Sequence, residues 1–558
     1  MSAMRTEGAI VSQTLTIDNS YPYPTSSKPM PTANYQYPGP PIYANENDIL
    51  MIRVINKLPQ PTTVHWHGLS QKGTQDMDGA VGITQCPIPP NAEMNYTFKA
   101  TPAGTAWYHG HYLDQYADGL IGPLIIRRKV EPNQQYYDTE RILMVADWYN
   151  DLGRTKLVSW YLNAKNPTGI EPIPDAIVVN GKFSESLFVP TNGSKHIRFR
   201  IINAAAFSMY TFSIDGLPLH VIELDQTCVQ PYKVPSIVLN VAQRVSCYVD
   251  LNEFDQTIVP AEVSPTKSIY IRFQAMADMY PVEIDTYIPP YRTPLFPYPI
   301  FFNTLFLGIL SLDSSNSMPT YPANQPRLNN PGSGTPGDTN MLTARPFFST
   351  ANIVPNATHY LKLVTTFRQD SSNISRGYLN NVTYGITQLN TSNKMAIPKC
   401  ISSPNMPLLY QMATLPNGLG IPSPIITSDS PLPSIQNDGY GHYLIPYGAV
   451  VDILLENQDE GEHPFHSHGY DFWVISTSDY PEAEQLYRGA YLKRDTVSVP
   501  ASGWVKIRLL ADNPGAWLFH CHIEWHMDAG LIAAFIVGPN ELLTQGYKIK
   551  TPPKRFCM

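Results

Sequence analysis

Residues 520–531 read HCHIEWHMDAGL, a stretch in which one cysteine stands between two histidines. Alternate residues of a β-strand point to the same face, so His520 and His522 share one face and Cys521 points to the other. A thiolate and two imidazoles on opposite faces predict two metal sites joined by a single strand. A copper ion held by one cysteine, two histidines and a weak or absent axial ligand is of the electron-transfer type. His463 and His526 are the histidines left to complete such a site.

Three more histidine clusters accompany this stretch. They read HWHG at residues 65–68, HGH at 109–111 and HPFHSHG at 463–469, so ten of the 14 histidines fall in four short segments. Each H-x-H pair presents two imidazoles to one side of a strand, and the four pairs supply eight. Structural zinc sites use about four ligands at C-x-x-C or H-x(3–5)-H spacing, which this pattern does not fit. We interpret the other four histidines as ordinary core or surface residues: His196, His220, His359 and His442.

Composition indicates a large, loop-rich β protein. The chain has 558 residues, of which 43% are apolar and only 15% charged, with 34 Tyr, 53 Pro and 34 Gly. At about 100–200 residues per domain, this length predicts three or four domains. A net charge of -8 and a pI near 6.0 give no basic field for nucleic acid. No stretch reaches the roughly 18 apolar residues of a membrane span, and we interpret the longest candidate, Pro299 to Leu312, as a core strand.

Short β-branched or aromatic runs broken by Pro, Gly and Asn fill most of the chain. They predict an all-β protein of Greek-key sandwich or barrel domains with a few short helices. We expect domains at residues 1–130, 131–312 and 346–558, with a Pro/Gly/Asn-rich linker at 313–345. The openings of the first and third domains, DILMIRVINKLPQPTTVHWHG and AVVDILLENQDEGEHPFHSHG, echo each other and suggest a duplication.

The motifs HWHG, WYHGH, HPFHSHG and HCHIEWHMDAGL resemble the four copper motifs of the multicopper oxidases, the family of laccases, ascorbate oxidase and fungal ferroxidases. The resemblance covers essentially the whole chain and implies three cupredoxin-like domains that hold four copper ions. It implies a type 1 copper at His463, Cys521 and His526, and a type 2 copper at His65 and His466. The type 3 pair falls to six residues: His67, His109, His111, His468, His520 and His522.

The same resemblance implies how the sites cooperate. Electrons from a reductant enter at the type 1 copper and pass through Cys521 to His520 and His522, where dioxygen is reduced to water. Asp78 in MDG and Glu524 in HCHIE match the acids that supply protons. Leu531 matches the axial position of the type 1 copper, and because leucine cannot coordinate, we expect a three-coordinate and more strongly oxidising copper.

The reductant is the least determined part of the function, because substrate loops vary most. Laccases typically place an acid where this chain has Phe207. Glu171 and Asp459 instead match carboxylates that bind ferrous iron in fungal ferroxidases, and Val282 stands at a third such position. Arg376 replaces a ferroxidase tyrosine.

No C-terminal membrane anchor follows Pro539, as an enzyme dedicated to a membrane permease would need. We therefore place laccase-like oxidation of phenols or naphthols first, in fungal pigment or secondary-metabolite formation, and oxidation of Fe(II) to Fe(III) as the alternative. A copper-binding electron carrier without turnover would leave the eight paired histidines unexplained.

Other features concern the compartment. Copper enzymes with sequons and disulfides are usually loaded in the secretory pathway, so we expect an extracellular, vesicular or cell-wall monomer, although the N-terminus MSAMRTEGAIVSQ has no signal-peptide pattern. By resemblance to laccases, Cys86 pairs with Cys557, and Cys228 and Cys247 flank a predicted hairpin and could also pair. Six sequons are candidate glycosylation sites: Asn95, Asn192, Asn356, Asn373, Asn381 and Asn390.

Overall fold

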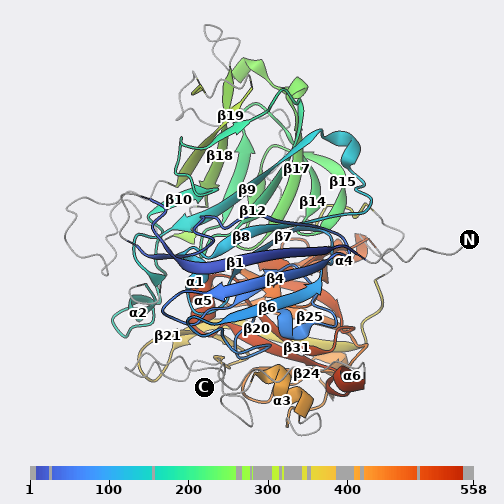
Figure 1. The fold of residues 1–558 in the computed structure, drawn as a ribbon. Coiled ribbons are helices and arrows are strands. Elements are labelled where there is room, and N and C mark those ends of the chain that lie inside the picture. The colour runs from blue at the N-terminus through green and yellow to red at the C-terminus, as the bar shows by residue number, and fades with distance from the viewer. Residues whose placement is uncertain are drawn as a thin grey trace, which may run out of the picture. The chain divides into compact units, whose positions relative to one another are not determined.

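A computed structural model of the chain describes residues 8–23, 28–153, 157–258, 267–276, 279–280, 304–312, 317–319, 342–347, 354–384, 407–414, 420–486 and 490–544. These residues form β-sheets joined by loops and a few short helices (Figure 1). The α-helices are α1 (Gln115–Asp118), α2 (Val158–Tyr161), α3 (Leu408–Thr414), α4 (Ala483–Leu486), α5 (Glu524–Asp528) and α6 (Pro539–Thr544). The all-β prediction with few short helices is confirmed.

Contacts divide the chain into two compact units. One comprises Met1–Lys129, Asp151–Glu171 and Ile353–Met558, and the other comprises Val130–Asn150 and Pro172–Asn352. Residues 151–171, which lie within the predicted second domain, belong to the first unit. Specific contacts hold this segment there: Gly153 N–H donates to Asp118 Oδ1 at 2.9 Å, and Gln369 Nε2 donates to the Pro167 carbonyl at 3.2 Å.

The first unit contains two sandwiches, each made of two sheets. The sheets of the N-terminal sandwich are β2 (Met30–Ala33), β1 (Ile10–Ser20), β4 (Ile49–Asn56), β6 (Glu93–Lys99), and β3 (Ile42–Asn45), β8 (Ile121–Arg127), β7 (Gly104–Gly110), β5 (Val64–His67), in spatial order. Strand β4 shows why they form: Leu50, Ile52 and Val54 are buried, while Met51 and Arg53 between them are exposed. Alternation of this kind buries one face of a strand.

The C-terminal sandwich has a larger first sheet. Its strands, in spatial order, are β22 (Ile425–Thr427), β23 (Ser430–Ser434), β20 (His359–Gln369), β25 (Val450–Asn457), β30 (Trp504–Leu510), β27 (Phe472–Thr477) and β28 (Leu492–Arg494), with β21 (Ser375–Leu379) paired to β20. The second sheet runs β24 (His442–Ile445), β32 (Ile532–Val537), β31 (Gly515–Cys521), β26 (His463–Ser467) and β29 (Thr496–Val499).

The second unit is a single sandwich. One sheet runs β10 (Ala176–Val179), β9 (Thr139–Trp148), β12 (His196–Asn203), β17 (Arg244–Asp250), β14 (Leu219–Leu224), β15 (Thr227–Val234), and the other runs β11 (Phe188–Pro190), β19 (Leu305–Ser311), β18 (Ser268–Ala275), β13 (Tyr210–Ile214), β16 (Ile237–Leu239). The predicted core strand within Pro299–Leu312 is β19 over its described part.

The same pairing recurs in all three sandwiches. Strands β4, β12 and β25 each have a parallel neighbour that comes earlier in the chain and an antiparallel neighbour that comes later. In each second sheet, an edge pair is parallel (β3 with β8, β11 with β19, β24 with β32) and the next pairings are antiparallel. These mixed Greek-key sandwiches are cupredoxin-like, as expected. The residue limits of the domains stay a prediction.

A buried asparagine marks the same corner of each sandwich. Asn56, Asn203 and Asn457 end strands β4, β12 and β25, and each side-chain oxygen accepts the backbone N–H two residues on, at 2.9 Å. Each side-chain nitrogen donates to two carbonyls: Gln60 and Ile88, Ser208 and Leu239, and Gly461 and Pro500, respectively. The suggested duplication therefore extends to the middle of the chain.

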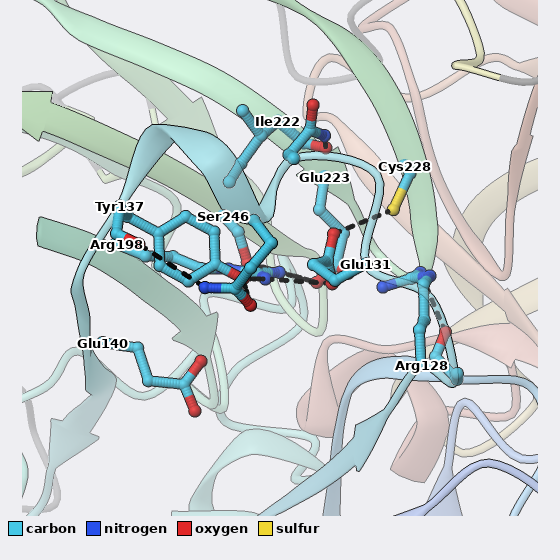
Figure 2. Close-up of polar contacts among 12 residues, drawn as sticks. Arg128, Glu131, Tyr137, Glu140, Arg198, Ile222, Glu223, Cys228 and Ser246 are labelled. Carbon is cyan, nitrogen blue, oxygen red and sulfur yellow. Dashed lines mark hydrogen bonds and ion pairs between the residues drawn. The ribbon is translucent and has the colours of Figure 1, made fainter. Parts of the chain in front are cut away.

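A buried network of charges lies on one sheet of the second unit (Figure 2). The Arg198 guanidinium lies 3.2 Å from both Glu131 and Glu223, and Arg200 lies 3.4 Å from Glu223. Ser246 donates a further hydrogen bond to Glu223 at 3.1 Å. Arg198 and Glu223 are completely buried, so each charge depends on the other for compensation.

The predicted disulfide bonds have different outcomes. Cys228 and Cys247 form no disulfide bond, so the pairing considered for them is wrong. Cys86 is disulfide-bonded, whereas Cys557 lies outside the described residues, so the Cys86–Cys557 pairing stays a prediction. Most of the linker 313–345, with Val282 and Asn390, also lies outside them. Among the described residues, no helix has the length and hydropathy needed to span a membrane.

Candidate metal centre

Two antiparallel strand pairs carry the paired histidines. In the N-terminal sandwich, β5 and β7 pair so that His65 lies opposite His109. In the C-terminal sandwich, β26 and β31 pair so that His466 lies opposite His520, and Phe465 opposite Cys521. His67, His111, His468 and His522 follow along the same strands and their ends, and all eight rings are buried.

The eight imidazoles form one cluster between the two sandwiches of the first unit. His65 stacks on His468 with ring centroids 3.9 Å apart, and His67 stacks on His466 at 3.7 Å. His111 and His520, also from different sandwiches, lie 5.8 Å apart. The sequence prediction that these eight side chains converge is thus reproduced in the geometry.

Four of the eight rings direct Nδ1 to a backbone carbonyl. The Nδ1 atoms of His65, His109, His466 and His520 donate to carbonyl oxygens of Asp78, Gly110, Asp495 and Cys521 at 2.8–2.9 Å. The Nε2 atoms of His65, His109, His111 and His466 are buried and have no hydrogen-bond partner among the described residues. Buried imidazole nitrogens of this kind are the expected form of metal ligands, whose other nitrogen is held by a protein acceptor.

The electrostatics of the cluster also suit a metal. Burial lowers the pKa of His468 and His520 to about 3, and lowers the pKa of His109, His111, His466 and His522 well below the ordinary value. Neutral imidazole is the form that binds a metal ion. Sets of three ligand atoms lie within 4.8 Å of one another, among them His65 with His466 and His468. The donors therefore fit a multinuclear copper cluster.

Cys521 faces away from this cluster into a second set of ligands. Its Sγ lies 3.5 Å from His526 Nδ1 and 3.8 Å from His463 Nδ1, and the two nitrogens are 3.1 Å apart. Burial would raise the pKa of the Cys521 thiol, but hydrogen bonds with His463 and His526 outweigh it and lower the pKa to about 7. The ring of Phe367 stacks on His463 at 5.5 Å. One soft thiolate with two imidazoles in a dry pocket fits a type 1 copper.

Two carboxylates contact the outer edges of these histidines. His526 Nε2 donates to Glu171 Oε1 at 2.9 Å, and His463 Nε2 donates to Asp459 Oδ2 at 3.2 Å. The two acidic side chains are 28% and 35% exposed, whereas the histidines are buried. Burial raises the pKa of Asp459, but its hydrogen bond with His463 lowers it to about 2. Glu171 and Asp459 therefore connect solvent to the predicted type 1 site.

Local loop structure holds each carboxylate in place. In the Glu171 loop, Asn166 Nδ2 donates to the Ile170 carbonyl at 2.9 Å, and Gly169 has φ +70°. A Cβ on Gly169 would lie 2.5 Å from Ser375 Oγ, so this close approach requires glycine. In the other loop, Asn457 Oδ1 accepts the Asp459 N–H at 2.9 Å.

The predicted proton-supplying acids, Asp78 and Glu524, are both buried. His468 Nδ1 donates to Asp78 Oδ2 at 2.8 Å, and Asp78 Oδ1 lies 3.3 Å from His65 Nδ1. Burial raises the pKa of Asp78, but the attraction of His468 and His65 holds it well below its usual range. Glu524 is the first residue of α5, two residues after His522, and is 3% exposed. Asp78 thus contacts two of the eight clustered histidines, and Glu524 lies two residues beyond a third, His522.

Sequence reasoning missed one acid at this cluster, Asp495. It is 2% exposed, its carbonyl accepts from His466 Nδ1 at 2.9 Å, and its Oδ1 lies 3.3 Å from His67 Nε2. A small cavity reaches the cluster here, lined by His65, His466 and Asp495 among others. The local sequence, KRDTV at 493–497, gives no sign of this contact, because His67 is 428 residues away in the chain.

The residues that bear on the substrate divide between the units. Phe207, where laccases place an acid, is buried in the second unit, with its ring 5.7 Å from Tyr280. Arg376, where ferroxidases place a tyrosine, is buried in β21, and its Nε donates to Asp370 Oδ2 at 3.1 Å. Among the described candidate substrate residues, only Glu171 and Asp459 contact the histidines of the predicted type 1 site, His526 and His463.

Comparison with known proteins agrees with this geometry. Family models described as multicopper oxidase match residues 14–131, 139–258 and 403–541. The chain is 30% identical over 525 residues to the iron transport multicopper oxidase fetC of Epichloe festucae, which covers 92% of this chain and 74% of that protein. It is also 30% identical to the iron transport multicopper oxidase fio1 of Schizosaccharomyces pombe, with 91% and 72% covered. The chain belongs to the multicopper oxidase family.

Solved structures give the same result. The crystal structure of Fet3p, a multicopper oxidase that functions in iron import, matches with a TM-score of 0.77 and 26% identity over 97% of this chain and 93% of that one. A laccase from Botrytis aclada shares the fold, with a TM-score of 0.73 and 23% identity over 97% and 89% of the two chains. The protein is accordingly a copper-dependent oxidoreductase that uses dioxygen as acceptor.

Proposed function

We propose that this protein is a ferroxidase, which oxidises Fe(II) to Fe(III) and passes the electrons to dioxygen. The observation that carries the proposal is the pair of hydrogen bonds from the type 1 histidines to two partly exposed carboxylates, Glu171 and Asp459. Hard carboxylate oxygens suit an iron ion. The sequence alone favours phenol oxidation, but the iron transport oxidases among the relatives support iron oxidation better.

The chain would hold four copper ions in the arrangement that the sequence implies. His463, Cys521 and His526 form the type 1 set, His65 and His466 the type 2 set, and the type 3 set comprises His67, His109, His111, His468, His520 and His522. Copper supplies the one-electron steps that link a one-electron reductant to the four-electron reduction of dioxygen. Cys521 and its neighbours His520 and His522 provide a covalent connection between the two centres.

Each proposed iron-binding carboxylate is one hydrogen bond from a type 1 histidine. Binding iron between Glu171 and Asp459 would place the donor ion against His526 and His463 without displacing either ring. Two negative charges at the same place also favour Fe(III) over Fe(II), because a trivalent ion gains more from them. The side chains thus hold the substrate and make its oxidation more favourable.

At the dioxygen end, we propose the proton-supply role for Glu524 and Asp78. In the structure, Asp78 accepts hydrogen bonds from His468 and holds that ring in place. Protein groups can orient metal ligands and pass protons from the same position. The cavity lined by His65, His466 and Asp495 reaches the same cluster, which suits the exchange of small molecules.

We also propose a secretory-pathway location and a monomeric state. Five of the six sequon asparagines are described, and all five are exposed: Asn95, Asn192, Asn356, Asn373 and Asn381. Glycan addition requires such exposure. Digestion with a glycosidase, followed by mass measurement of protein from a eukaryotic host, would test glycosylation directly.

The deciding experiment compares Fe(II) with a dimethoxyphenol as reductant for the copper-loaded protein, by oxygen consumption. Glu171→Gln and Asp459→Asn keep the side-chain shape and remove the charge. A hydrogen bond to a charged group contributes about 1.5–3 kcal/mol, so we expect kcat/KM for Fe(II) to fall at least about tenfold in each variant. Turnover of the phenol should change less.

Glu460→Gln is the matched control, because Glu460 is the exposed neighbour of Asp459 in the same loop. It removes the same charge one residue away and should leave Fe(II) turnover near that of the wild type. If the wild type prefers the phenol and the two carboxylate variants oxidise Fe(II) as well as it does, the ferroxidase proposal is wrong. Phenol oxidation would then be the better account.

A further inference from the structure

The eight-histidine cluster is built from two matching halves. In one half, the Asp78 carbonyl accepts from His65 Nδ1 at 2.8 Å, and the Asp78 carboxylate accepts from His468 Nδ1 at 2.8 Å. His65 belongs to the N-terminal sandwich with Asp78, whereas His468 belongs to the C-terminal one. One aspartate therefore holds a ring of its own sandwich through its backbone and a ring of the other through its side chain.

The second half repeats this arrangement with the sandwiches exchanged. The Asp495 carbonyl accepts from His466 Nδ1 at 2.9 Å, and the Asp495 Oδ1 lies 3.3 Å from His67 Nε2. His466 shares the C-terminal sandwich with Asp495, and His67 comes from the N-terminal one. The rings stack in the same two pairs, His65 on His468 and His67 on His466.

We propose that Asp495 is a positioning residue for the copper cluster and the structural counterpart of Asp78. Its carboxylate holds His67 with the proton on Nε2, which leaves Nδ1 as the ligand atom, and its carbonyl holds His466 with Nε2 as the ligand atom. Asp495 thereby joins the two sandwiches at the cluster. This role is independent of whether the reductant is iron or a phenol.

The tautomer of His67 is the reason that an acceptor is needed at this point. A neutral imidazole carries one proton, and the hydrogen bond made by one nitrogen decides which nitrogen can bind a metal. His65, His109, His466 and His520 all donate through Nδ1, whereas the contact of His67 is through Nε2. A backbone carbonyl accepts from each of the first four rings, whereas the Asp495 carboxylate of the other sandwich lies 3.3 Å from the Nε2 atom of His67.

Neighbouring hydrogen bonds hold both the carboxylate and the carbonyl group of Asp495 in position. Thr496 Oγ1 donates to Asp495 Oδ1 at 2.8 Å, and the same hydroxyl lies 3.4 Å from His67 Nε2. The Ser467 N–H donates to the Asp495 carbonyl at 3.0 Å. Asp495 is 2% exposed, and a buried carboxylate is costly without hydrogen-bond donors. Thr496 and His67 lie within reach of this carboxylate.

The test compares Asp495→Leu, which removes the acceptor, with Asp495→Asn, whose side-chain oxygen can still accept from His67. Three readouts apply to each copper-loaded variant: copper per chain, the electron paramagnetic resonance spectrum of the type 2 site, and the near-ultraviolet absorption of the coupled pair. The visible thiolate-to-copper band of Cys521 serves as an internal reference. Asp438→Leu is the matched control, because Asp438 lies 2.7 Å from His442 Nδ1 outside the cluster.

We expect Asp495→Leu to bind cluster copper about 10–100-fold more weakly and to keep the visible band. Asp495→Asn and Asp438→Leu should keep all the cluster signals. The proposal is overturned if Asp495→Leu retains full copper and unchanged cluster spectra. If Asp495→Leu also loses the visible band, Asp495→Asn decides: intact cluster signals in that variant support the role, and their loss overturns it.

Discussion

Leu531 is the residue that most directly sets the properties expected of the type 1 copper. It is completely buried, and its backbone is tied to two ligands, because Cys521 N–H donates to its carbonyl at 3.1 Å and its own N–H donates to the His526 carbonyl at 3.0 Å. If Leu531 takes the axial position, as the resemblance implies, a type 1 copper here would have three ligands, because leucine cannot coordinate. We therefore expect a more strongly oxidising copper than one with an axial thioether.

Leu531→Met offers a thioether at the same place and should lower the reduction potential of the type 1 copper. The two side chains have similar volumes, so we expect a stability cost below about 1.5 kcal/mol. Redox titration followed by the visible band measures the potential. Leu518→Met, on β31 three residues before Cys521 and also buried, should leave the potential unchanged. An equal shift in both variants would contradict an axial role for Leu531.

A residue pair remote from the cluster should shape the acid sensitivity of the protein. His442 Nδ1 donates to Asp438 Oδ2 at 2.7 Å, and His442 Nε2 lies 3.2 Å from the Tyr384 hydroxyl. Burial raises the pKa of Asp438, but its hydrogen bond with His442 outweighs this and lowers the pKa below its usual range. A carboxyl group with a depressed folded pKa stabilises the protein above the unfolded pKa and loses this effect as pH falls.

Asp438→Asn should therefore be less stable than the wild type at neutral pH, with a difference that narrows below about pH 4, near the unfolded pKa of aspartate. Thermal denaturation of both proteins over a series of pH values measures this difference. A gap that stays constant down to the lowest pH would show that the charge of Asp438 is not what stabilises the site.

At the scale of elements, the three asparagine corners place the loops that follow strands β4, β12 and β25. Each asparagine makes the same three hydrogen bonds, but only the loop after Asn457 carries residues of the metal centre, Asp459 and His463. The loop after Asn56 leads toward His65, several residues further on. The same asparagine corner therefore also positions residues of the metal centre, but only in the C-terminal sandwich.

Substituting each corner asparagine by alanine separates stability from function. Loss of buried hydrogen-bond partners costs about 1–3 kcal/mol, so Asn56→Ala, Asn203→Ala and Asn457→Ala should destabilise the protein to similar extents. Only Asn457→Ala should also alter the visible copper band and Fe(II) turnover. Equal spectral changes in all three variants would mean that the corner acts through stability alone.

The sequence predicted the histidine cluster well because its signal is local. The alternation of a strand places His520 and His522 on one face and Cys521 on the other, and the structure has them so. The acids are different, since Asp495 is 428 residues from His67, and no local pattern predicts contact over that separation. Glu171 and Asp459 were identified only through resemblance, because a carboxylate in a loop has no periodic signal.

At the scale of the whole molecule, the compact units are not continuous stretches of the chain. Composition and strand spacing assigned residues 151–171 to the second predicted domain, but they belong to the first unit. The reason is specific contact rather than hydrophobic pattern, as the Gly169 approach to Ser375 shows. This excursion brings Glu171 to His526 and cannot be inferred from strand periodicity.

All the predicted copper ligands belong to the first unit, so the second unit can be weakened without touching them. Glu223 is its most critical acid, because it is completely buried and contacts Arg198, Arg200 and Ser246. Removing one partner of a buried ion pair costs about 3–5 kcal/mol, since the other charge stays buried and unpaired. Glu223→Leu should therefore unfold at a clearly lower temperature.

Calorimetry together with the visible copper band tests this prediction. Below its unfolding transition, Glu223→Leu should show the wild-type visible band, because the surroundings of Cys521, His463 and His526 are unchanged. Glu140→Gln is the control, since Glu140 is a partly exposed partner of Arg200 at 2.9 Å, and such pairs contribute about 1 kcal/mol or less. If both variants unfold at the same temperature, the buried network contributes no more than a surface ion pair, because the guanidinium groups would have found other partners.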